Sequence, residues 1–115
     1  MRTNLLVSFT IDATHYWPSP PPKYFTFGFV HRHMFRFRVR MPTSGEGGEA
    51  RREMELWELR EQLEQLAKTI GTVTDGVLSF GGLSCEGIAE QLLKLSHAWW
   101  VYVGEDDYLG AEVFA

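Results

Sequence analysis

Polar and apolar side chains alternate through the sequence Val30-His31-Arg32-His33-Met34-Phe35-Arg36-Phe37-Arg38-Val39-Arg40. Because successive side chains of a β-strand point to opposite faces, this alternation predicts a strand with two distinct faces. One face carries His31, His33, Phe35, Phe37, Val39 and Met41, and the other carries Arg32, Met34, Arg36, Arg38 and Arg40. Both histidines are therefore expected on the apolar side, at the start of the strand.

The same alternation occurs earlier in the chain, over residues 4–13. Its apolar face is the pattern of a half-buried strand and consists of Leu5, Val7, Phe9, Ile11 and Ala13. If the alternation continues past the strand, His15 falls on the same apolar side as these odd-numbered residues. Residues 16–24 contain four prolines, so we expect a rigid loop between two antiparallel strands, with a proline ligand of a signalling domain as the alternative. Such a loop returns His15 to the side of His31 and His33.

The composition is that of one packed domain over residues 1–115, with 44% hydrophobic and 14% aromatic residues. The formal net charge of -4 argues against a dedicated nucleic-acid-binding protein, because such domains are usually basic. Cys85 is the only cysteine, which excludes an intramolecular disulfide and favours a reducing compartment. The sequence lacks a secretory pattern and the ~20 apolar residues of a membrane span. We therefore expect a cytoplasmic protein with no membrane partner.

The second half of the chain changes to helical periodicity. After a glycine-rich connection over residues 43–50, apolar residues at three- and four-residue steps predict an amphipathic helix from about Met54 to Ile70. Residues 71–83 are expected to hold a short strand or only a loop. Ser84 is expected to cap a second helix, whose predicted buried side consists of Ile88, Ala89, Leu92 and Leu95.

Two further strands are predicted, over residues 98–103 and 111–114. The expected order is β-β-α-α-β-β, an α+β fold with a four-stranded antiparallel sheet and two helices on one face. Trp99 and Trp100 point to opposite faces of one strand, so at least one is poorly buried in a monomer. This arrangement favours a homo-oligomer.

Three of the four histidines, His15, His31 and His33, are predicted to lie on one face at neighbouring strand ends. Neutral imidazoles bind zinc tetrahedrally at about 2.0–2.1 Å, and three protein ligands leave the fourth position to water or substrate. That open position is typical of a functional zinc ion. The alternative is that the histidines are polar core residues. His97, at a helix-to-strand junction, is expected to be structural or exposed.

Four short motifs occur in register along nearly the whole chain. They are Phe9-Thr10-Ile11-Asp12-Ala13-Thr14-His15, His31-Arg32-His33-Met34-Phe35, Ser84-Cys85-Glu86-Gly87-Ile88-Ala89 and Val101-Tyr102-Val103-Gly104-Glu105. Together they resemble the 6-pyruvoyl-tetrahydropterin synthase and 6-carboxytetrahydropterin synthase family of the tunnelling fold. The first motif resembles the family's strand that ends in a zinc-binding histidine, and the second resembles its His-Gly-His motif. The third resembles its helix start with the pattern Thr-x-Glu-x-x-Ala. The fourth resembles its strand that ends in a pterin-binding glutamate.

The resemblance implies a zinc-dependent lyase that acts on a pterin or related purine-like ligand. Zinc would lie on His15, His31 and His33, and Glu105 would hold the ring, because a carboxylate accepts two N–H bonds from a 2-amino-pyrimidinone edge. The alternative for Glu105 is an exposed acid in a hairpin turn. Glu86 is a second candidate for substrate binding, with stabilisation of the helix start as its alternative. The resemblance also implies a trimer, or a hexamer of two stacked trimers.

The chain departs from the family's pattern at the catalytic positions, so no catalytic residue is predicted. Phe27 stands where the family has its catalytic cysteine, and residues 71–83 contain Asp75 but no histidine for the family's Asp-His dyad. Cys85 is expected to be a small buried residue separated from the site. Three functions stay open: a pterin lyase or hydrolase-like enzyme, a protein that binds the ligand without turnover, and a structural oligomeric protein.

Overall fold

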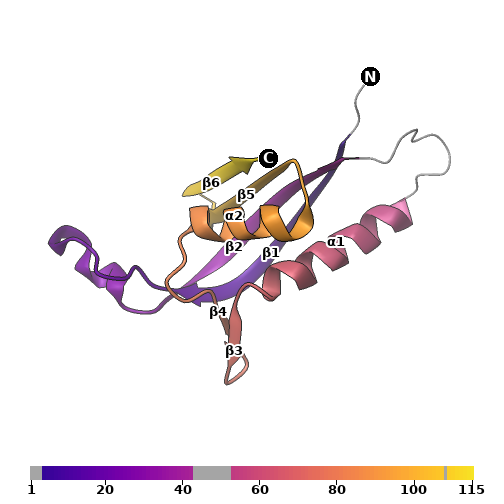
Figure 1. The fold of residues 1–115 in the computed structure, drawn as a ribbon. Helices are drawn as coiled ribbons and strands as arrows, with labels where there is room; N and C mark the ends of the chain where they lie inside the picture. Colours follow the sequence, from indigo (N-terminus) through magenta and orange to yellow (C-terminus); the bar gives the residue numbers. More distant parts are fainter. Residues whose placement is uncertain (1–3, 43–52, 108) are drawn as a thin grey trace.

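The computed structural model describes residues 4–42, 53–107 and 109–115 (Figure 1). The predicted connection over residues 43–50 lies outside these ranges. Along the chain, the elements are β1 (Asn4–His15), the 3-10 helix η1 (Pro22–Gly28), β2 (His31–Pro42), α1 (Glu53–Lys68), β3 (Thr72–Thr74), β4 (Val77–Ser79), α2 (Cys85–Ser96), β5 (Trp100–Glu105) and β6 (Leu109–Phe114).

The described residues form a six-stranded sheet in the order β3-β4-β1-β2-β5-β6. The prediction of a four-stranded antiparallel sheet with two helices was therefore wrong. β4 runs parallel to β1 where Thr14 pairs with Ser79, which makes the sheet mixed. With η1, the described part of the chain has three helices, and the order without η1 is β-β-α-β-β-α-β-β.

Residues 71–83 were expected to hold one short strand or only a loop, but they hold two strands, β3 and β4, which form a hairpin around Asp75 and Gly76. These two residues have positive φ angles of 52° and 77°. Two-residue hairpin turns require such angles, and glycine adopts them without steric cost. The strands are only three residues each, and Leu78 is their one buried residue, so their alternation is too short to be recognised.

β1 and β2 pair antiparallel along their whole length, from Asn4 opposite Pro42 to His15 opposite His31. Their inward faces alternate as predicted, and the buried residues are Val7, Phe9, Ile11, Ala13, Phe35, Phe37 and Val39. The rings of Phe9 and Phe37 stack with centroids 4.9 Å apart. This ladder extends the core face of the sheet as far as His15.

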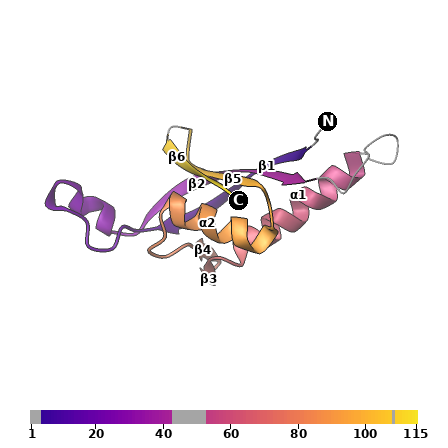
Figure 2. The same ribbon diagram turned by 45° about the horizontal axis from the view of Figure 1, so that its top comes forward.

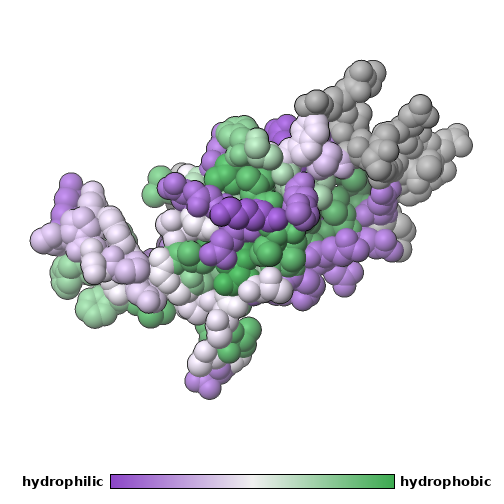
Figure 3. Space-filling view, viewed as in Figure 1, coloured by the Kyte–Doolittle hydropathy of each residue, from purple (hydrophilic) through white to green (hydrophobic). Residues whose placement is uncertain are grey.

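α1 and α2 lie on the same side of the sheet (Figure 2). Ser84 caps α2 as predicted, because its hydroxyl accepts a hydrogen bond from the backbone N–H of Gly87 at 3.2 Å. Leu95 was predicted on the buried side of α2 but is 47% exposed, since it lies at the margin of the stripe that ends at Ser96. Hydrophilic side chains run along the outer surface of α2 (Figure 3). Among the described helices, none is long and apolar enough to cross a membrane.

Residues 16–30, called the arm below, extend away from the sheet between β1 and β2 (Figures 1 and 2). Part of this segment was predicted to be irregular, yet it contains the start of η1. A hydrogen bond of 2.8 Å from the N–H of Trp17 to the carbonyl of Phe27 closes its base. Along it, Tyr24 stacks on Trp17 at 5.7 Å and on Phe27 at 6.0 Å. The arm thus holds a row of aromatic rings that ends beside β2.

Candidate metal centre

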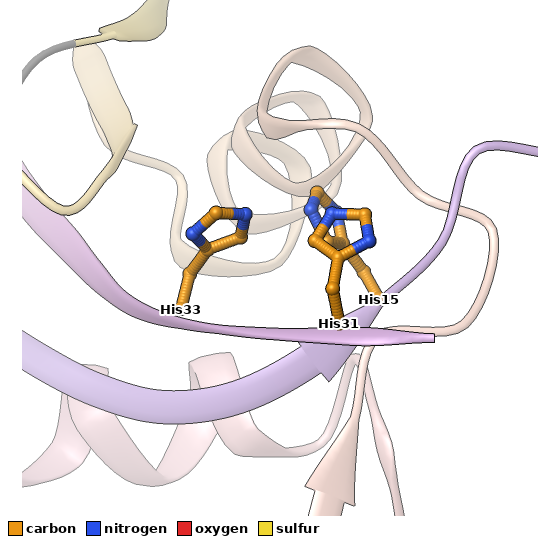
Figure 4. Close-up of side chains that lie close together, drawn as sticks. All are labelled: His15, His31 and His33. Atoms are coloured by element: carbon orange, nitrogen blue, oxygen red, sulfur yellow. The ribbon is translucent and has the colours of Figure 1, made fainter. Parts of the chain in front are cut away.

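The three histidines predicted as ligands meet at one end of the β1–β2 ladder. His15 ends β1, while His31 and His33 open β2, and the rings rise from the same side of the paired strands (Figure 4). One ligand nitrogen from each ring lies within 4.8 Å of the others, and among the described residues these three form the group that could hold a metal ion. His97 instead ends α2 in a left-handed conformation, with φ of 58°. Strand parity therefore located the cluster correctly.

Each histidine has its Nδ1 bound to an oxygen acceptor. The acceptors are the carbonyl of Leu83 for His15 at 2.9 Å, the carbonyl of Phe29 for His31 at 2.9 Å, and Oδ2 of Asp106 for His33 at 2.8 Å. A carbonyl or carboxylate accepts but cannot donate, so a neutral ring carries its proton on Nδ1. Each Nε2 then presents a lone pair, which is the arrangement that hydrogen-bonded metal-binding histidines show.

His15 provides the test of whether these residues fit a metal ion. Its side chain is 6% exposed, and burial, the largest influence, lowers its pKa below the ordinary value. The Nε2 of His15 is buried and has no hydrogen-bond donor among the described residues. A buried acceptor without a partner is destabilising, and a coordinated cation would satisfy it. The donor set therefore fits a metal ion.

Glu105 brings a carboxylate to the same cluster from the end of β5. Pairing of β5 with β2 sets Glu105 opposite Phe35. Its Oε1 lies 3.1 Å from Nε2 of His15, and its Oε2 lies 3.6 Å from Nε2 of His33. Glu86 is exposed in the first turn of α2, outside the described pocket lining. Of the two acids predicted to bind substrate, the structure places only Glu105 at the histidines.

Asp106 is a site residue that the sequence reasoning missed. Its φ of 53° lies in the left-handed region, where Asp is tolerated better than most residues. The carboxylate accepts hydrogen bonds from Nδ1 of His33 and from the N–H of Met34, and the first of these is the main cause of its lowered pKa. The sequence did offer one sign of this role: Asp106 is an acidic residue directly after the strand that ends at Glu105. Its register against His33 follows only from the pairing of β5 with β2.

Cys85 was predicted to be separated from the site, and this prediction was wrong. The residue is the first of α2, is buried, and donates a hydrogen bond from its thiol to Glu105. Burial, together with the negative charge of Glu105, raises the pKa of the thiol to about 12. Cys85 is therefore a protonated neighbour that orients Glu105.

A pocket of about 400 Å³ opens above the cluster. Besides the three histidines and Glu105, it is lined by Tyr16, Trp17, Phe27, Gly82, Leu83, Ser84 and Leu109. Phe27, which stands where the resemblance places a catalytic cysteine, lies 5.9 Å from His31 between ring centroids. The pocket thus combines one polar end with mostly apolar walls.

Comparison with known proteins supports the fold alone. No protein-family model matches the chain, and no curated protein matches it. The crystal structure of an uncharacterized protein from Wolinella succinogenes is similar, with a TM-score of 0.69 and 11% sequence identity. The match covers 99% of this chain and 98% of that chain.

Proposed function

We propose that this chain is a zinc-binding protein, similar to 6-pyruvoyl- and 6-carboxytetrahydropterin synthases, that acts on or binds a pterin or related purine-like ligand. The observation that carries the proposal is the unpartnered Nε2 of His15 beside two imidazoles, those of His31 and His33, that are held in the ligand-ready tautomer. Imidazole ligands suit zinc among the common divalent ions. When bound, zinc would supply a Lewis acid at the polar end of the pocket.

The pocket walls support a flat, nitrogen-rich ligand. Trp17, Phe27 and Leu109 offer apolar surface, and aromatic rings favour stacked or edge-on contacts with another ring. Glu105 offers a carboxylate that can accept two N–H bonds from one edge of a pterin or guanine-like ring. The volume of about 400 Å³ is within the range of small-molecule sites.

The residues at the pocket favour binding over the family's lyase reaction. A general base must come within about 2.6–3.2 Å of the proton that it removes. Phe27 cannot act as a base, and the thiol of Cys85 keeps its proton because its pKa is about 12. We therefore expect that the protein binds pterin but does not convert dihydroneopterin triphosphate, the substrate that the resemblance implies. Product formation at the rate of a family enzyme would contradict this expectation.

An enzymatic function is the second candidate, and the pair of His33 and Asp106 favours it. A carboxylate that accepts a hydrogen bond from Nδ1 orients the imidazole, as in many acid–base sites. If turnover of a pterin substrate is observed, loss of turnover in Asp106→Asn with retained ligand binding would support this candidate.

Metal analysis of the purified protein tests the proposed function. We expect about one zinc ion per chain, removable by a chelator, and the loss of that zinc in His33→Ala. His97→Ala is the matched control, because His97 is a histidine outside the cluster. A wild-type protein that takes up no zinc after reconstitution would contradict the proposal and favour a structural role for the histidines.

We further propose a cytoplasmic homo-oligomer, a trimer or hexamer. β6 is an edge of the described sheet, and its Leu109 and Phe114 are each 70% exposed. Open edges with apolar residues favour pairing with another chain. Trp99 and Trp100 are both only half-buried. Light scattering at micromolar concentration should give a particle larger than one chain, and a monomer would contradict this proposal.

A further inference from the structure

The carboxylate of Glu105 and the nitrogens that it faces are all acceptors. His15 donates from Nδ1 to the carbonyl of Leu83, so its neutral ring offers only a lone pair at Nε2. Oε1 of Glu105 lies 3.1 Å from that lone pair. Nε2 of His33 lies 3.6 Å from Oε2, beyond hydrogen-bond length, and Nδ1 of His33 is bound to Asp106. With the His15 ring neutral and the carboxylate ionised, two acceptors face each other at the contact of His15 with Glu105, and a coordinated cation between them would make the contact favourable.

The two contacts of Glu105 have lengths close to the separation between two ligands of one tetrahedral zinc ion. Ligand atoms at about 2.0–2.1 Å from a tetrahedral centre lie about 3.3 Å from one another. Oε1 of Glu105 lies 3.1 Å from Nε2 of His15, and Oε2 lies 3.6 Å from Nε2 of His33, so each oxygen lies near that distance from one imidazole. The carboxylate also accepts a hydrogen bond from the thiol of Cys85, at the start of α2. Glu105 is thus directed at the cluster by two elements, β5 and α2.

We infer that Glu105 is a fourth protein ligand of the metal while the pocket holds no organic ligand, and that a pterin-like ring draws it away from the metal. This inference rests on the proposed function and adds a coordinating role to Glu105. Two N–H bonds from one ring edge and a metal ion both need the lone pairs that the two oxygens turn toward the histidines, so the ring and the metal compete for the same side of the carboxylate. Ring binding and coordination by Glu105 are therefore coupled and oppose each other.

Zinc affinity and cobalt spectroscopy test the inference in the full-length protein. Zinc affinity is measured by chelator competition in the wild type, Glu105→Gln, His33→Ala and Glu90→Gln. Glu90 is an exposed acid on α2 and serves as the matched control. We expect Glu105→Gln to weaken zinc binding by about tenfold or more and Glu90→Gln to leave it unchanged.

Cobalt(II) replaces zinc for the second readout, because its visible bands report the number and type of ligands. Glu105→Gln should change the bands of the cobalt-loaded protein. Unsubstituted pterin added to the wild type should shift its bands toward those of Glu105→Gln. Circular dichroism checks that each variant is folded.

The outcomes separate this inference from the proposed function. Wild-type zinc affinity and an unchanged cobalt spectrum in Glu105→Gln would overturn the inference while leaving the three-histidine site intact. Pterin that binds without altering the wild-type cobalt bands would overturn the displacement of Glu105. A wild type without zinc binding would overturn the proposed function and this inference with it.

Discussion

The metal cluster and the arm are neighbours in sequence but are stabilised in different ways. In the cluster, every histidine has a bound Nδ1, and Phe35 beneath the rings is fully buried. In the arm, η1 contributes no buried residue, and Phe25 and Phe29 are 61% and 66% exposed. The cluster is therefore positioned by contacts from several distant segments. The arm contacts a distant segment at its base, where the N–H of Tyr16 donates to the carbonyl of Gly81, and beyond that base its rings stack on one another. A substitution should be costly in the first region and mild in the second.

Truncation of Phe35, whose ring packs beneath the histidine cluster, should have the largest effect on stability. The ring of Phe35 lies 5.0 Å from that of His15 and 5.7 Å from that of His33, between centroids. Phe35→Ala should lower the free energy of unfolding by about 3–5 kcal/mol because it leaves a cavity, and it should also weaken zinc binding. Chemical denaturation measures the first effect. A loss below about 1 kcal/mol would show that the cluster is no better packed than an ordinary site.

The thiol of Cys85 should be nearly inert in the folded protein. Burial and Glu105 raise its pKa from 9.0 to about 12, so alkylation at pH 8 should be about a thousandfold slower than in the denatured chain. The same shift removes stability as the pH rises above about 9.0, because the unfolded thiol then ionises while the folded thiol does not. Mass spectrometry after iodoacetamide treatment follows the reaction. Equal rates in the folded and denatured protein would mean that Cys85 is neither buried nor in contact with Glu105.

Removal of the Asp106 carboxylate, which accepts a hydrogen bond from His33, should have a smaller effect on the protein. Asp106→Asn should weaken zinc binding by about 10–100-fold, because an amide orients the imidazole less well and does not raise its basicity. Asp107→Asn is the matched control, since Asp107 pairs with Arg36 at 2.7 Å. Chelator competition gives both affinities. Similar losses in the two variants would mean that general charge, not the contact with His33, sets the affinity.

The smallest effect is expected in the arm. Phe25→Ala should change the free energy of unfolding by less than about 0.5 kcal/mol and leave zinc affinity unchanged, because the ring is mostly exposed. Thermal and chemical denaturation measure it. A loss that grows with protein concentration would show that Phe25 packs against another chain, which would contradict the expectation that substitutions in the arm are mild.

The part of the site that depends on strand parity could be predicted from the sequence. His15, His31 and His33 lie where alternation along β1 and β2 places them, because alternation is a local rule and the antiparallel ladder preserves it. The cap at Ser84 was predictable for the same reason, since a cap depends on residues three positions apart.

The partners of these residues could not be predicted in the same way. The carbonyl of Leu83 reaches His15 across 68 positions of sequence, and Asp106 reaches His33 across 73. The contact of Cys85 with Glu105 needs the start of α2 to lie over the end of β5. Such contacts follow from tertiary packing, which no local pattern encodes. The hairpin at Asp75 and Gly76 differs, because its turn signal was local but its strands were too short to support it.

The arm leaves and rejoins the sheet at a single paired position, His15 opposite His31. The hydrogen bond from Trp17 to Phe27 then closes its base. Because the entropy of closing a loop changes slowly with its length, residues can be added or removed beyond this closure without shifting the strand register. The arm is thus a natural insertion point. Peptides grafted there would be displayed on the arm, away from the sheet, while the metal ligands stay in place.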